Sequence, residues 1–78
     1  LKLFAIWQEE LGGLAKHAQI GKFREGKLLV EVDNPVYMQE LSAKRRSIIE
    51  KVNKRMGKRL IEEVRFRLGK TDRGRSDD

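Results

Sequence analysis

The side chains with the clearest chemistry are the lysines and arginines between positions 34 and 59. That segment carries eight basic and two acidic residues, whereas residues 1–33 and 60–78 each carry five basic and five acidic residues. The net charge of +6 therefore lies in the middle of the chain. Rows of cations neutralise successive phosphates and release the counterions around a nucleic acid, without reading its sequence. The predicted nucleic-acid-binding residues are Lys44, Arg46, Lys51, Lys54, Arg55, Lys58 and Arg59.

Two alternatives to this interpretation stay open. The basic segment could be a solvated helix face, and a high total charge is also typical of heat-stable proteins. Arg45 is a separate case, because it falls within the apolar stripe of the same segment, where a buried charge without a partner is costly. Either its head group extends to solvent, or this part of the stripe meets another protein. We assign Arg45 to partner binding.

Catalytic chemistry has weak support in this sequence. His17 is the single histidine and has no Ser, Cys or Asp nearby in sequence, so we expect a structural or surface role. The pairs Glu9-Glu10 and Glu62-Glu63 are sequence neighbours, whose side chains point in different directions. Phosphate-binding loops, dinucleotide glycine patterns and metal-ligand spacings do not occur. We expect a protein that is not an enzyme, with no cofactor, metal or small-molecule substrate.

The first predicted element is a helix over residues 2–18. Apolar side chains recur there at helical spacing, and Trp7 shares the stripe with Leu3 and Leu11, so we expect Trp7 to anchor the core. Gly12-Gly13 inside this helix predicts either a kink or close packing against its backbone, and we favour close packing. Residues 19–32 form short apolar segments separated by Gly21 and Gly26, and the alternation that begins at Leu28 indicates a hairpin that turns at Glu25-Gly26.

The second predicted helix runs from 34 to 56. Asp33-Asn34-Pro35 is a helix-start signal and Gly57 a C-terminal cap. The alternation toward residue 68 predicts a third strand. Residues 70–78 lack apolar side chains, which predicts a disordered tail or linker. Each element has one apolar side, so the expected fold is α+β: helix, strand, strand, helix, strand, with both helices on one face of a three-stranded sheet over residues 1–69.

Size and composition agree with one small domain. Without cysteine the 78-residue chain has no disulfide, and its core must come from apolar packing. We expect a cytoplasmic protein without a membrane segment, since a span needs about 20 apolar residues. The chain begins with Leu1 and not Met, so we expect a piece of a longer protein, in which a missing targeting segment says nothing about location.

Five segments, in this order and with these gaps, resemble the DciA family of bacterial replicative helicase loaders. They are Trp7-Gln8-Glu9-Glu10-Leu11-Gly12, Leu14-Ala15-Lys16-His17, Glu25-Gly26-Lys27-Leu28-Leu29-Val30-Glu31-Val32, Asn34-Pro35-Val36-Tyr37-Met38-Gln39-Glu40-Leu41 and Val64-Arg65-Phe66-Arg67-Leu68-Gly69. The resemblance covers residues 3–69. Two positions depart from the family pattern, which usually has Trp at Tyr37 and Thr at Ala18.

The resemblance implies a KH-like domain that binds a DnaB-type replicative helicase and helps to place it on single-stranded DNA, without being an ATPase. It supplies no residue-level site, so the basic residues above rest on the charge argument. A conventional RNA-binding KH domain carries a Gly-x-x-Gly clamp, which this chain lacks. The alternative is a nucleic-acid-binding module, for RNA or single-stranded DNA, without a helicase partner. Tyr37 and Phe23 could stack on bases, although such aromatics more often belong to the core.

Overall fold

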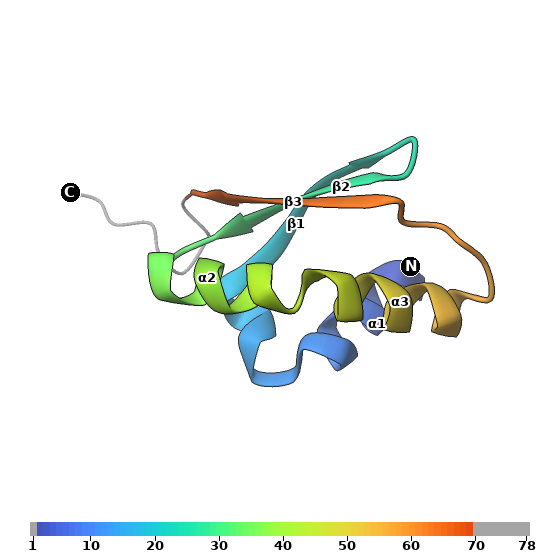
Figure 1. Cartoon of the computed structure of the whole chain (residues 1–78), viewed down its shortest axis with the longest axis horizontal. Coiled ribbons are helices and arrows are strands. Elements are labelled where there is room, and N and C mark those ends of the chain that lie inside the picture. The colour runs from blue at the N-terminus through green and yellow to red at the C-terminus, as the bar shows by residue number, and fades with distance from the viewer. Residues whose placement is uncertain (1, 70–78) are drawn as a thin grey trace.

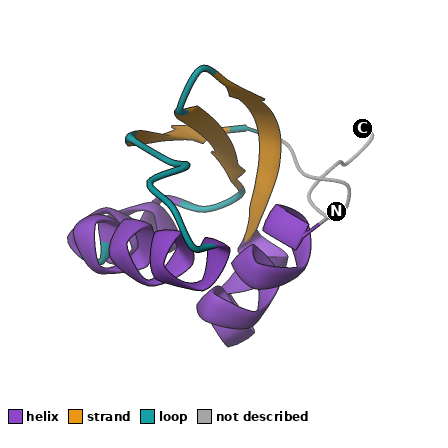
Figure 2. Cartoon of the chain, turned by 90° about the vertical axis from the view of Figure 1, so that its right-hand side faces the viewer, coloured by secondary structure: helices purple, strands orange, loops and turns teal. Residues whose placement is uncertain are grey.

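The fold is α+β, as the sequence predicts. The computed structural model describes residues 2–69, so the tail predicted over 70–78 lies outside the described residues. The elements in chain order are α1 (Lys2–Leu11), a 3-10 helix η1 (Gly12–His17), β1 (Ala18–Arg24), β2 (Lys27–Val32), α2 (Pro35–Ala43), α3 (Arg45–Met56) and β3 (Glu63–Leu68). The strands form one mixed sheet in the order β1-β2-β3, with β1 antiparallel and β3 parallel to β2. The helices lie together on one face of this sheet (Figures 1 and 2).

The central strand β2 supplies the inner face of the sheet. Leu28, Val30 and Val32 are buried and alternate with more exposed neighbours, which is the period of a strand with one covered face. The hairpin between β1 and β2 turns at Glu25 and Gly26, whose φ angles are +51° and +80°. Two residues with positive φ match the right-handed twist of the flanking strands, so the predicted turn is confirmed.

Trp7 anchors the core, as its place in the apolar stripe predicts. Its side chain is 2% exposed, and its indole Nε1 donates a hydrogen bond to the carbonyl oxygen of Ala18 at 3.3 Å. A buried indole N–H needs such an acceptor, and this one belongs to the first residue of β1. Trp7 therefore ties α1 to the edge of the sheet.

The first helix is shorter than predicted. It ends at Leu11, because Gly12 takes a φ of +58° that ends an α-helix, and the chain continues as the 3-10 helix η1. The expected close packing against Gly12 and Gly13 was wrong, since no other part of the described chain lies within 4 Å of the position that a Cβ would take at either residue. The glycine pair therefore ends α1, and the chain continues from it as the 3-10 helix η1.

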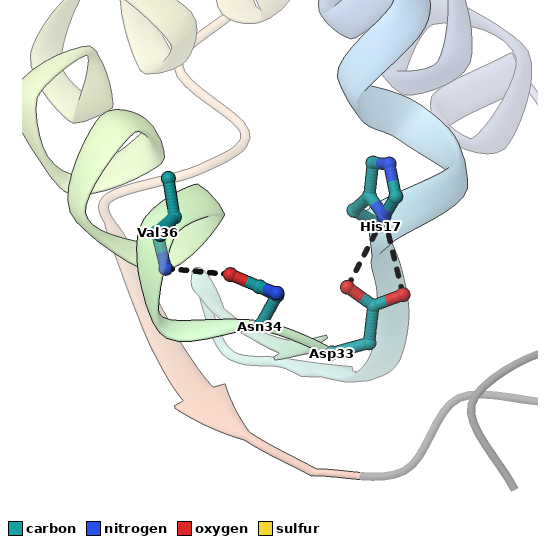
Figure 3. Close-up of polar contacts among 4 residues, drawn as sticks. All are labelled: His17, Asp33, Asn34 and Val36. Carbon is teal, nitrogen blue, oxygen red and sulfur yellow. Dashed lines mark hydrogen bonds and ion pairs between the residues drawn. The ribbon is translucent and has the colours of Figure 1, made fainter.

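The predicted second helix is divided into two helices, α2 and α3. The predicted cap is confirmed: the Asn34 side chain accepts a hydrogen bond from the Val36 amide at 2.7 Å, and Pro35 opens α2 (Figure 3). Gly57 ends α3 with a φ of +81°. The helix breaks at Lys44, however, where φ is −100° and ψ is 3°. The Lys44 amide bonds to the carbonyls of both Glu40 and Leu41, which tightens the last turn of α2. The break means that Lys44 does not share one continuous helix face with the cations of α3.

Candidate nucleic-acid interface

A groove runs between α3 and the segment of residues 57–62 that leads into β3. Its volume is about 1070 Å³. The residues that line it are Arg45, Arg46, Ile49, Glu50, Asn53, Lys54, Gly57, Lys58, Arg59, Ile61 and Glu62. Four of the seven predicted nucleic-acid-binding residues are among them, namely Arg46, Lys54, Lys58 and Arg59. The structure therefore gathers these four around one depression.

The second wall of the groove follows from how α3 ends. The left-handed Gly57 turns the chain back, and its amide bonds to the carbonyls of Asn53 and Lys54. The returning segment is then held by Asn53, whose Nδ2 donates to the Ile61 carbonyl and whose Oδ1 accepts from the Ile61 amide, both at 2.8 Å. Figure 1 shows this segment leaving α3 and rising to β3. The Asn53 side chain thus helps to position Lys58 and Arg59, together with backbone hydrogen bonds from Gly57 and Lys58 to the end of α3 and from Glu62 to Gly26.

The interior of the groove is aliphatic. Ile49 is half-buried and presents aliphatic surface to the groove, whereas Ile61 is fully buried at 0% exposure and belongs to the core against which Ile49 packs. An apolar surface edged by cations can hold the flat face of a base or another apolar group while the rim binds anions. The groove therefore offers apolar contacts and ionic contacts side by side, a combination that a solvated helix face lacks.

Arg45 lies at the groove with its charge over an aromatic ring. Its guanidinium carbon is 5.3 Å from the ring centroid of Phe66, a residue of β3. A cation in this position is attracted by the negative face of the ring, by about 0.5–2 kcal/mol. The Arg45 Nε is buried and has no hydrogen-bond partner among the described residues. The ring explains how a cation is tolerated within the apolar stripe.

The other three predicted residues lie outside the groove. Arg55 forms ion pairs with Glu9 and Glu10 of α1, the second at 3.2 Å. The hydrogen bond to Glu9, followed by the one to Glu10, raises the pKa of the Arg55 guanidinium above its usual value. Lys44 pairs with Glu40 at 3.4 Å. Lys51 is exposed on α3 and does not line the groove.

His17 has an acidic partner that its sequence neighbours did not suggest. The imidazole Nδ1 lies 3.2 Å from both carboxylate oxygens of Asp33, 16 residues away (Figure 3). The imidazole also stacks on Tyr37, with 3.9 Å between ring centroids and 11° between ring planes. These contacts connect η1 to the junction of β2 and α2. They give His17 and Tyr37 structural roles, and Tyr37 is engaged within the fold instead of being free to stack on a base.

Two further properties of residues 2–69 bear on the chemistry. Nowhere in this part of the chain do three or more His, Asp or Glu side chains gather in a way that could hold a metal ion. The described helices are also too short or too polar to cross a membrane. The groove is thus a site built from cations, two carboxylates and aliphatic side chains.

Comparison with protein families finds a match over most of the chain. The model of the family described as Dna[CI] antecedent, DciA, matches residues 1–66 of the 78-residue chain. The matched span contains all residues of the groove and ends within β3. No curated protein matches the chain.

Proposed function

The chain belongs to the DciA family, and from that premise we propose that it is a bacterial, cytoplasmic DNA replication initiation factor. It binds a DnaB-type replicative helicase and promotes the loading of that helicase on single-stranded DNA, without being an enzyme itself. The observation that carries this proposal is the family match over residues 1–66. The family description names no reaction.

We propose that single-stranded DNA binds at the groove beside α3. Arg46, Lys54, Lys58 and Arg59 line it, and among the described residues these cations have no ion-pair partner. They engage about three to five phosphates together with neighbouring cations, so that binding is weak, independent of sequence and steeply dependent on salt. Lys51 extends this surface, whereas Lys44 and Arg55 contribute less because carboxylates of the same chain already neutralise them.

Arg45 is the residue that we assign to contact with the helicase. It lines the same groove, at the side where Phe66 of β3 holds its guanidinium. An arginine that is already positioned loses less conformational freedom on binding than a free one. A partner protein with a carboxylate at this point would gain a charged hydrogen bond to the guanidinium, which forms no ion pair among the described residues.

The mechanism that fits this chemistry is selection of a helicase state. The sequence contains no phosphate-binding loop, so the protein acts through binding energy and not through hydrolysis. A partner that binds both helicase states equally shifts nothing, whereas a preference of about 1.4 kcal/mol changes their population ratio tenfold. We therefore propose that the domain binds more tightly to the helicase state that admits DNA.

The decisive experiment pairs a binding assay with a loading assay. The chain, with its flanking segments where the gene encodes them, is first mixed with the cognate replicative helicase in a pull-down. The same components are then incubated with a covalently closed single-stranded circle, and loaded helicase is measured with and without the chain. We expect a complex and stimulated loading. Absence of both would refute the loader proposal.

A second candidate function is favoured by the groove itself. A cationic depression with an aliphatic interior suits a nucleic-acid-binding module that has no helicase partner. Binding of single strands without any helicase complex would select this function. Binding of RNA and DNA strands of equal length and composition would then be compared, because the 2′-hydroxyl distinguishes them.

A further inference from the structure

Two carboxylates lie in the groove beside the cations. Glu50 projects from α3 and Glu62 from the segment that enters β3, and both line the groove. Among residues 2–69 neither carboxylate forms an ion pair. A surface for phosphates alone gains nothing from them, since like charges about 4 Å apart repel by about 1 kcal/mol even in water. Both carboxylates can accept hydrogen bonds from a ligand group that donates them.

An unpaired nucleotide has such a group. Cytosine carries an exocyclic amino group that donates hydrogen bonds, whereas thymine and uracil have a carbonyl oxygen at the same ring position. In a duplex these amino groups are engaged in base pairing and the base faces are stacked. In a single strand the amino group, the apolar face and the phosphate are all accessible. These three features correspond to the carboxylates, the aliphatic interior and the cations of the groove.

We propose that the groove holds an unpaired base of single-stranded DNA, and that Glu50 and Glu62 accept hydrogen bonds from exocyclic amino groups and so favour cytosine over uracil. This inference rests on the DNA binding proposed above and adds a base preference to it. The cations serve the phosphates, while the half-buried aliphatic side chain of Ile49 contacts the base face. The preference is modest because both glutamates are exposed to solvent.

The architecture supports a base site at this position. Asn53 fixes the segment that carries Glu62 by two hydrogen bonds to Ile61, so the backbone of this wall is set before the ligand arrives. Arg45 is held over Phe66 at the same groove. Positioned groups lose less freedom on binding, so even exposed side chains can discriminate between two bases of equal size.

The test compares two ligands that differ in one edge of the base. Fluorescence anisotropy measures binding of oligodeoxycytidine and oligodeoxyuridine of about ten nucleotides at one low salt concentration and neutral pH. Deoxyuridine replaces thymidine so that the methyl group does not contribute. We expect the cytidine strand to bind about threefold to tenfold more tightly, as one or two net hydrogen bonds predict.

Two matched double variants locate the effect. Glu50→Gln with Glu62→Gln replaces the acceptors with amides that can both donate and accept, so the difference between the two strands should disappear. Glu25→Gln with Glu40→Gln removes the same charge outside the groove, so both strands should bind somewhat more tightly and the difference should persist. Circular dichroism checks that each variant folds.

Three results would overturn the inference. Equal affinity of the wild-type chain for both strands would remove the base preference and leave the proposed DNA binding intact. A preference that survives in the groove variant would place recognition elsewhere. Absence of binding to either strand would remove the inference together with the DNA contact, while the helicase pull-down would report on the loader proposal independently.

Discussion

Asn53 and Ile61 are joined by a reciprocal pair of hydrogen bonds, each 2.8 Å long, in which the side-chain amide of Asn53 takes both polar groups of the Ile61 backbone. Ile61 has 0% exposure, so its backbone lies where unpaired polar groups are costly. The side chain thus closes the turn after α3 and fixes the second wall of the groove. Stability and the shape of the candidate site depend here on the same residue.

Replacement of Asn53 should therefore destabilise the fold. Asn53→Ala removes both bonds and leaves the amide and carbonyl of Ile61 unpaired, which costs about 2 kcal/mol. Urea unfolding should show a lower midpoint, and hydrogen exchange at the Ile61 amide should become faster. Gln39→Ala, at an exposed position on α2, is the control and should change little. An unchanged midpoint for Asn53→Ala would show that the pair contributes nothing to stability.

Trp7 is the position where truncation should be most damaging. Trp7→Ala empties a nearly fully buried site and should cost about 3–5 kcal/mol, which is comparable to the total stability of a small domain. Trp7→Phe keeps most of the packing and loses the hydrogen bond to Ala18, so it should be milder. Thermal unfolding followed by circular dichroism separates the two. A stable Trp7→Ala protein that had lost only DNA binding would contradict a core role.

The features that the sequence predicted correctly have local causes. Asn34 and Pro35 at the start of α2, Gly57 at the end of α3 and the turn at Glu25-Gly26 each depend on the conformation that one or two residues prefer. The break at Lys44 had no such signal, because neither glycine nor proline occurs there. Tertiary packing decides such a break, and periodicity alone cannot locate it.

The candidate site was likewise predictable only in part, because the sequence shows local features and not contacts between distant segments. The uneven distribution of charge along the chain identified a basic segment, and four of its predicted residues do line one groove. Spacing could not show that Arg55 lies against Glu9 and Glu10, which are 46 and 45 residues away. Nor could it reveal the wall formed by Asn53 and Ile61, or the place of Glu50 and Glu62 in the groove. These facts follow from how α1, α3 and β3 meet.

Arg55 should behave as a link between α1 and α3 and not as a DNA contact. Arg55→Glu places three carboxylates together, so the unfolding midpoint should fall. The triple variant Glu9→Lys, Glu10→Lys, Arg55→Glu restores opposite charges and should recover part of the loss. Urea unfolding at low salt measures both, because exposed pairs are screened by salt. If Arg55→Glu were as stable as wild type, the ion pairs would have no structural importance.

Tyr37 should tolerate another aromatic side chain but not an aliphatic one. It stacks on His17 with nearly parallel rings, and such a pair contributes about 0.5–1.5 kcal/mol beyond the area it buries. Tyr37→Trp should keep the stack and the stability, in agreement with the resemblance to a family that usually has Trp there. Tyr37→Leu should lose the stacking contribution. Equal unfolding midpoints for Tyr37→Leu and wild type would contradict this role.

The final prediction concerns the cations of the groove and the dependence of DNA binding on salt. Each phosphate contact with a single strand contributes about −0.7 to the slope of log affinity against log salt. Lys54→Gln with Arg59→Gln removes two groove cations, so the slope should become shallower by about 1.4. Lys16→Gln with Lys22→Gln removes the same charge from exposed positions outside the groove and should change the slope much less. Anisotropy titrations of a single strand at several salt concentrations give the three slopes. Equal slopes for the two double variants would mean that the groove holds no more phosphates than the rest of the basic surface.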